Sequence, residues 1–115
     1  MQLDLDSIPF KGTSYPGVSI HFYYSDRRTG HAAVMVRIEP GASYPRHRHN
    51  GPEELLILQG GFRDEHGEYY AGEFCRFEDG STHHPIALEE GPDGGRACIF
   101  FAIATEGIEL FPPGA

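Results

Sequence analysis

Residues 41–60, Gly41-Ala-Ser-Tyr-Pro-Arg-His47-Arg-His49-Asn-Gly-Pro-Glu53-Glu-Leu-Leu-Ile-Leu-Gln-Gly60, contain the most informative pattern in the sequence. Side chains of a β-strand alternate between its two faces, so His47 and His49 point the same way, about 7 Å apart along the strand. The Asn50-Gly51-Pro52 segment predicts a turn that brings the Glu53 carboxylate beside both rings. Two imidazoles and a carboxylate on one face can bind a transition metal ion.

A second stretch, residues 72–83, supplies a fourth ligand. It begins at Gly72 and ends at His83, which follows a predicted turn over residues 78–82. Each stretch also offers an alternative ligand, since Glu54 follows Glu53 and His84 follows His83. Strand alternation allows only one residue of each pair on the ligand face, and the turn before Glu53 favours that residue. We expect Glu54 and His84 to face outward or to support the ligands. Three further histidines are expected in core or surface positions: His21, His31 and His66.

Together the two stretches have the form Gly-x5-His-x-His-x3-Glu-x6-Gly, followed by Gly-x5-Glu-x-Gly-x2-His, which resembles the two-part signature of the cupin superfamily. Residues 45–54, 58–67, 71–72 and 80–83 are similar, more narrowly, to the cupin domain of the ChrR anti-sigma factors and their stand-alone relatives. The resemblance implies a double-stranded β-helix, or jelly-roll barrel, and a single cupin domain over residues 1–115. It also implies one divalent transition metal bound by four side chains: His47, His49, Glu53 and His83.

The chain departs from this family at a few points. Cupins commonly carry Pro where this chain has Glu78 and Asn where it has Ala87, and these positions affect turn rigidity and packing rather than the ligands. The anti-sigma factors also carry a helical, metal-binding domain before the cupin, and no such segment precedes Met1 in this sequence. We therefore expect metal binding to carry over from the family and sigma-factor inhibition not to.

The composition limits the partners. The chain has 115 residues, with 9 Lys and Arg against 17 Asp and Glu, which gives a formal net charge of −8. This length predicts one domain, and the scattered basic residues argue against nucleic acid as a partner. No apolar run approaches the roughly 20 residues of a membrane helix, and the N-terminus lacks the features of a secretory signal. We expect a cytoplasmic protein without membrane contact, in which Cys75 and Cys98 are buried thiols without a redox role.

Glycine and proline interrupt the sequence at short intervals between segments rich in Val, Ile, Phe and Tyr, which is typical of an all-β protein. Strands are predicted over residues 2–5, 18–24, 32–38, 47–49, 53–58, 62–64, 69–70, 74–77, 84–88 and 97–104. The apolar tail from Gly107 is expected to dock on the domain. Residues 55–58 and 99–103 are apolar at consecutive positions, which predicts strands covered on both faces. Because a partner subunit can provide the outer cover, we expect a homodimer.

Three neutral imidazoles and one carboxylate suit Zn or Fe, and also Ni, Mn or Cu. We expect a metal-binding protein that binds or senses a small molecule, as the ChrR resemblance implies. The alternative is an enzyme, a mononuclear metal-dependent dioxygenase acting on a small carbonyl or phenolic substrate, and a purely structural metal site is a third hypothesis. Arg46 and Arg48 lie beside the ligands, either as exposed charges or as cations that steer an anionic substrate. Four aromatic residues are candidates for the wall of a cavity or for core packing: Tyr44, Tyr69, Tyr70 and Phe74.

Overall fold

The computed structural model describes residues 3–93 and 95–111, which form three antiparallel sheets and one short 3-10 helix, η1 (Leu5–Ser7). The largest sheet has six strands in the order β1 (Lys11–Gly12), β2 (Val18–Asp26), β3 (His31–Ile38), β11 (Cys98–Ala104), β5 (Glu53–Gln59) and β8 (Phe74–Phe77). The second sheet has the order β10 (Ile86–Ala87), β6 (Gly61–Asp64) and β7 (Gly67–Tyr70). The third has the order β12 (Ile108–Leu110), β4 (His47–His49) and β9 (Thr82–His83).

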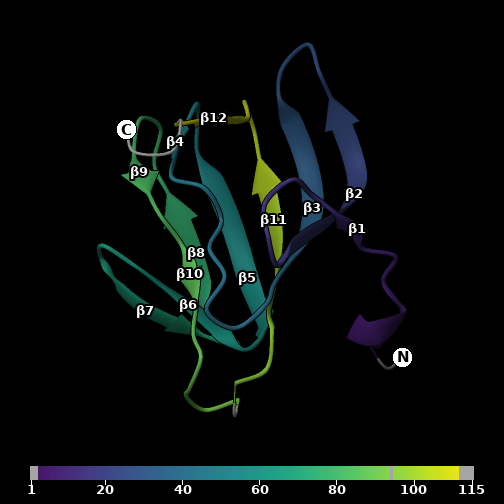
Figure 1. Cartoon of the computed structure of the whole chain (residues 1–115). Helices are drawn as coiled ribbons and strands as arrows, with labels where there is room; N and C mark the ends of the chain where they lie inside the picture. The colour runs from purple at the N-terminus through teal and green to yellow at the C-terminus, as the bar shows by residue number, and fades with distance from the viewer. Residues whose placement is uncertain (1–2, 94, 112–115) are drawn as a thin grey trace.

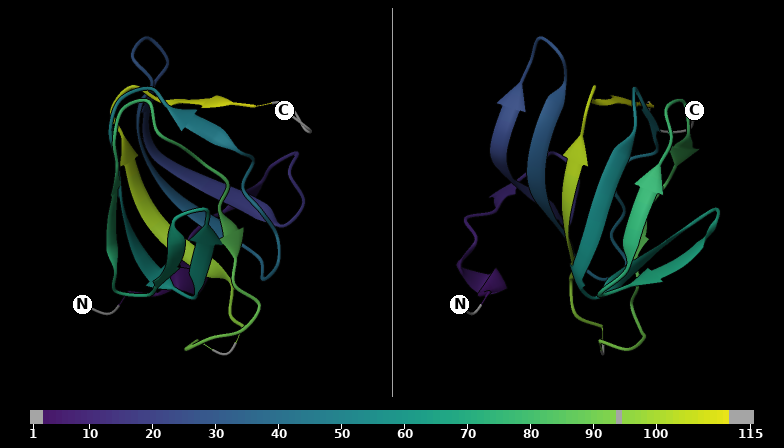
Figure 2. Two further views of the ribbon diagram at one scale, coloured as in Figure 1. Left: turned by 90° about the vertical axis from the view of Figure 1, so that its left-hand side faces the viewer. Right: turned by 180° about the vertical axis from the view of Figure 1, so that it is seen from behind.

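The two small sheets face the large one. In Figure 1 the large sheet spans the molecule, with the second sheet at the lower left and the third at the upper left. Figure 2 shows from two further sides that the sheets curve toward one another without closing into a continuous barrel. The core lies between them, because inner-face residues of the large sheet, such as Ile57 and Phe100, form one cluster with Phe62 of β6 and Ala87 of β10.

Most of the predicted strands are confirmed. The hairpin predicted over residues 18–24 and 32–38 is present as β2 and β3, and the strands predicted at 47–49, 53–58 and 97–104 are present as β4, β5 and β11. The tail docks as expected, since Ile108 and Leu110 of β12 pair with His49 and His47 of β4. The end of that tail, Pro112 and Pro113, lies outside the described residues.

The strand predicted over residues 2–5 is wrong for the part that the structure describes. Gln2 lies outside the described residues, Leu3 and Asp4 are in no strand, and Leu5 begins η1. The Asp4 side chain accepts a hydrogen bond from the Asp6 backbone N–H at 3.1 Å, so it caps a helical turn. Such local capping overrides the short apolar alternation. No helix in the described part of the chain has the length and apolarity needed to cross a membrane.

A single chain does not cover residues 55–58 and 99–103 on both faces, so the predicted outer cover would have to come from a partner subunit. On the inner face of β5, Leu55 and Ile57 are 3% and 0% exposed, whereas Leu56 on the outer face is 39% exposed. On β11, Ile99 is fully buried but Ile103 is 38% exposed. The outer face of the large sheet therefore carries apolar side chains, at Leu56 and Ile103, that are partly open to solvent.

Candidate metal centre

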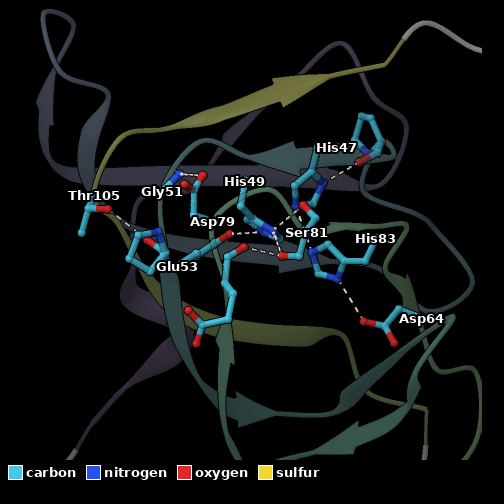
Figure 3. Close-up of polar contacts among 12 residues, drawn as sticks. His47, His49, Gly51, Glu53, Asp64, Asp79, Ser81, His83 and Thr105 are labelled. Carbon is cyan, nitrogen blue, oxygen red and sulfur yellow. Dashed lines mark hydrogen bonds and ion pairs between the residues drawn. The ribbon is translucent and has the colours of Figure 1, made fainter.

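Two paired strands of the third sheet bring the predicted histidines together. His47 on β4 lies directly opposite His83 on β9. Alternation along β4 buries His47 and His49, which are 4% and 0% exposed, and turns Arg48 between them toward solvent. One ring nitrogen from each of the three histidines lies within 4.8 Å of the other two. Figure 3 shows the three rings gathered on one side of these strands.

Backbone hydrogen bonds join the first histidine segment to the loop that precedes His83. The His49 N–H donates to the Ser81 carbonyl at 2.9 Å, and the Gly80 N–H donates to the His49 carbonyl at 2.8 Å. The Gly51 N–H donates to Asp79 Oδ1 at 3.0 Å. Gly51 has φ of +108°, and a Cβ there would lie 2.9 Å from Thr105 Oγ1, so this turn requires glycine.

Glu53 completes the group from the start of β5. Its Oε2 lies 2.7 Å from His49 Nε2, and its side chain is 14% exposed. Glu54 points to the opposite face, where Arg76 Nη1 lies 3.5 Å from its Oε2 and the carboxylate is about half exposed. The structure thus brings Glu53 and the three histidines together and leaves Glu54 apart.

Hydrogen bonds determine which nitrogen of each ring faces the centre of the group. Each Nδ1 lies beside an oxygen that can only accept: Pro45 O at 2.8 Å from His47, Ser81 O at 3.2 Å from His49, and Asp64 Oδ2 at 2.9 Å from His83. The Ser81 hydroxyl also lies 3.0 Å from His49 Nδ1, and because it donates to the Glu78 carbonyl it accepts from the ring. Each Nδ1 is therefore the donor, and each neutral ring carries its lone pair on Nε2.

These lone pairs converge on one point. His47 Nε2 and His83 Nε2 are 3.0 Å apart. The buried His49 Nε2 has no hydrogen-bond partner in the part of the chain that the structure describes, yet it lies 2.7 Å from a Glu53 carboxylate oxygen. Lone pairs and a carboxylate this close repel one another unless a proton or a metal cation lies between them.

A proton is a poor occupant of the contact between His47 Nε2 and His83 Nε2 near neutral pH. Burial, with a smaller contribution from neighbouring His83, lowers the pKa of His47 to about 4. Burial also lowers the pKa of His83 and outweighs the opposing effect of its hydrogen bond to Asp64. Imidazole Nε2 lone pairs and a carboxylate are the ligand types of a divalent transition metal, so the residues present fit such an ion.

Asp64, at the end of β6, is a member of the site that the sequence patterns did not indicate. Its side chain is fully excluded from solvent, its Oδ2 accepts from His83 Nδ1, and its Oδ1 accepts from the His66 backbone N–H at 2.8 Å. A carboxylate in this position orients the ring and makes its Nε2 a stronger donor. Figure 3 shows Asp64 on the side of His83 away from the other histidines.

The other histidines lie outside this group. The His84 backbone N–H donates to Glu65 Oε1 at 2.9 Å, and the His84 side chain is not among the clustered ligands. His21 and His31 contact Tyr23 and Tyr24 edge to face, with ring centroids 4.6 and 5.3 Å apart. Their placement agrees with the core or surface roles expected from the sequence.

Only one of the four aromatic candidates borders the space beside the site. Tyr44 lines a cavity of about 250 Å³ together with His47, Glu53 and His83, and its ring centroid lies 5.2 Å from that of His47. Burial, then the charge of Glu53, raises the pKa of Tyr44 to about 12, so its hydroxyl remains a donor. The remaining candidates do not line it: Tyr69 packs on Phe62, Tyr70 hydrogen-bonds Glu68, and Phe74 is 63% exposed.

The two cysteines lie in the core and not among the clustered ligands. Cys75 and Cys98 are buried free thiols. Burial raises the pKa of Cys75 to about 11 and that of Cys98 to about 12. Because the thiolate is the reactive form, neither side chain is suited to rapid oxidation.

Comparison with known proteins identifies relatives of the chain. A family model described as the ChrR cupin-like domain matches residues 1–101. The anti-sigma-E factor ChrR of Cereibacter sphaeroides is 39% identical over 76 residues, which cover 64% of this chain and 33% of that protein. The chain therefore spans about a third of the length of this curated relative.

Solved structures have the same architecture. The crystal structure of Rhodobacter sphaeroides SigE in complex with the anti-sigma ChrR matches with a TM-score of 0.72 and 29% identity, over 88% of this chain and 50% of that one. An acetylacetone dioxygenase from Acinetobacter johnsonii matches with a TM-score of 0.75 and 14% identity, over 98% of this chain and 77% of that one. The second likeness concerns the fold alone. Together they confirm the predicted all-β cupin jelly roll.

Proposed function

The chain belongs to the ChrR cupin-like family, and on that premise we propose that it is a metal-binding cupin that binds or senses a small molecule. One divalent transition metal ion is held by four ligands: His47, His49, Glu53 and His83. The domain extends over residues 1–115, with its two ligand motifs at 41–60 and 72–83. Zn or Fe is the metal that we favour, while Ni, Mn and Cu suit the same donor set.

One observation carries this proposal. Each of the three imidazoles donates its Nδ1–H to a fixed acceptor, so three Nε2 lone pairs and the Glu53 carboxylate meet with no protein donor between them. A buried group made of acceptors alone is unfavourable, because each acceptor has lost its hydrogen bonds to water and gained none from the protein. A cation at their meeting point relieves this cost, which supports a metal site over a group of ordinary buried histidines.

The site has a closed side and an open side. His49 is stacked on Phe77, with ring centroids 5.1 Å apart and an interplanar angle of 15°, and it does not line the cavity. His47, Glu53 and His83 do line it. When bound, a metal ion supplies a Lewis acid that can hold and polarise an oxygen atom of a ligand on this side. The Tyr44 hydroxyl, on the same wall, can donate a hydrogen bond to that ligand.

The alternative function is that of a mononuclear metal-dependent dioxygenase acting on a small carbonyl or phenolic substrate. The cavity beside three of the four ligands favours it over a closed structural site. It predicts oxygen consumption by Fe(II)-loaded protein with a 1,3-diketone or a dihydroxyaryl compound, and loss of that consumption in His47→Ala. Protein purified with Zn that consumes no oxygen across such a panel after Fe(II) loading would exclude the enzyme.

We also propose that the domain is a cytoplasmic homodimer. Its outer sheet face carries a row of paired residues, Phe101, Leu56 and Phe74, with Leu56 and Phe74 39% and 63% exposed. Ile103 beside them is 38% exposed. A second copy placed against this face would cover these side chains and remove their apolar surface from water.

The metal content of purified variants tests the main proposal. Protein prepared without chelators should contain close to one equivalent of a transition metal by elemental analysis. His83→Gln and Glu53→Gln should lower that content strongly. The neighbouring substitutions His84→Gln and Glu54→Gln are matched controls, because neither side chain belongs to the cluster, and they should leave the metal content unchanged. Equal metal content in all four variants would contradict the assignment.

A further inference from the structure

The cavity beside the candidate metal centre has a mostly apolar lining. It lies against the inner face of the large sheet, and most of its wall is hydrocarbon: Ile20, Val34, Val36, Leu55, Phe100 and Ala102. Three of the four proposed metal ligands, His47, Glu53 and His83, occupy one part of this wall. Phe22 and Ser25, which also line the cavity, are exposed, so its mouth lies beside the β2–β3 hairpin.

Few polar groups are available to a bound molecule away from the metal ligands. Among the described residues that line the cavity there is no Lys or Arg, and the side-chain hydroxyls are those of Tyr44 and Ser25. A phosphate or a sugar buried here would lose its hydrogen bonds to water without replacing them, which costs affinity for every unpaired group. The wall therefore selects an apolar molecular body.

The metal centre selects the other end of the ligand. A divalent ion with neutral His47, His49 and His83 and one Glu53 carboxylate has a net charge of about +1 in surroundings of low polarity. A single negative charge on the ligand neutralises it. An oxygen atom of the bound molecule is suited to coordinate the metal, because it can also accept a hydrogen bond from the Tyr44 hydroxyl.

The cavity volume limits the size of the bound molecule. At about 30 Å³ for each water-sized group, 250 Å³ holds about eight such groups. We propose that the cavity binds a small monoanion in which an oxygen-donor head, of the carboxylate or enolate type, coordinates the metal and an uncharged hydrocarbon body fills the apolar space. This inference rests on the proposed metal function and names the chemical class of its ligand.

A series of 2-hydroxy acids tests separately the contributions of the metal-coordinating group and of the hydrocarbon chain to binding. Lactate carries the head almost alone, 2-hydroxyhexanoate adds a hydrocarbon chain, and gluconate has the same carbon count with a hydroxylated chain. Binding to Co(II)-loaded protein is followed by the visible spectrum of the metal and by calorimetry. From the extra buried methylene groups, 2-hydroxyhexanoate should bind on the order of 50-fold more tightly than lactate. Gluconate should bind no better than lactate, and 1-hexanol should leave the metal spectrum unchanged.

Two substitutions on β3 form a matched pair. Val34 lines the cavity, whereas Ala33 points to the opposite face of the sheet. Val34→Phe should fill the cavity and reduce the preference for 2-hydroxyhexanoate over lactate at least tenfold, with metal content retained. Ala33→Phe should preserve the preference. If Val34→Phe does not fold, the ligand series on the unaltered protein still decides the question.

The failures are distinguishable because metal content is measured on the same samples. Metal-loaded protein that binds lactate and 2-hydroxyhexanoate equally, or that prefers gluconate, would overturn the ligand class and leave the metal function intact. Equal effects of Val34→Phe and Ala33→Phe would also overturn it. Protein that takes up no metal would overturn both the metal function and this inference.

Discussion

Replacing Asp64 should weaken metal binding without removing any of the four ligands. Its Oδ2 accepts from His83 Nδ1 at 2.9 Å, and the two side chains are 0% and 3% exposed, so water does not screen or replace the bond. A hydrogen bond to a buried charged group contributes about 1.5–3 kcal/mol. At about 1.4 kcal/mol for each factor of ten, this corresponds to a loss of roughly 10–100-fold in metal affinity, which agrees with the usual effect of such supporting carboxylates.

The two substitutions at this position should differ in size. Asp64→Asn keeps an amide oxygen that can accept from His83 Nδ1 but loses the charge, so we expect about a tenfold rise in the Zn dissociation constant. Asp64→Ala leaves the buried His83 Nδ1–H without a partner, and we expect the Zn dissociation constant to rise about 100-fold. Competition with a chromophoric chelator measures both constants, and Glu68→Gln, an exposed change on neighbouring β7, is the control. Zn affinities within twofold of the unaltered protein for both Asp64 variants would refute this reasoning.

Three further predictions concern pH, thiols and assembly. Because burial lowers the pKa of His47 from 6.5 to about 4, the unfolded chain binds this proton more readily, so metal-free protein should lose up to about 3 kcal/mol of stability as the pH falls from 6.5 to 4. Urea midpoints measure this loss, and a metal-free His47→Gln variant should lack the corresponding part of the slope; an identical slope in both proteins would be contrary evidence. Cys75 and Cys98 should react with iodoacetamide at pH 8 only after unfolding, and rapid labelling of the folded protein, read by mass spectrometry, would show that the thiols are accessible. Leu56→Glu should raise the dimer dissociation constant about tenfold or more by placing a charge on the apolar sheet face, and light scattering that shows a monomer for the unaltered protein would remove the dimer.

Local patterns were sufficient to predict much of the site. The two-residue period of a strand places His47 and His49 on one face and Arg48 on the other, as the structure shows. The same alternation explains why Glu53 faces the rings while Glu54 faces Arg76. These relationships involve neighbours in the chain, so the sequence contains them directly.

The contribution of Asp64 could not be predicted in this way. It is separated from His83 by 19 residues, and the two meet because β6 pairs with β10, just after His83 in the chain. No spacing rule connects an aspartate at the end of one hairpin with a histidine beyond the next. Ser81, in contrast, lies inside the second motif, within the turn that precedes His83, so its closeness to the ligands follows from the sequence.

Packing between distant segments also determines which aromatic residues line the cavity. Tyr44, Tyr69 and Phe74 are equivalent in the sequence as aromatic residues near the motifs. Only Tyr44 lines the cavity, because Phe74 points to the outer face and Tyr69 packs on Phe62. The cover of the outer face of β5 likewise depends on packing that the sequence does not contain. Consecutive apolar residues indicate that Leu56 needs a cover, but they do not identify whether the same chain provides it.

The proposed metal centre can be tested by anomalous diffraction from a crystal of protein prepared without chelators and kept with its native metal. We expect one metal peak at about 2.0–2.2 Å from Nε2 of His47, His49 and His83 and from a Glu53 oxygen, with an open position toward the Tyr44 side of the cavity. A peak at another group of residues, or none after soaking with Zn, Fe(II) and Ni, would contradict it.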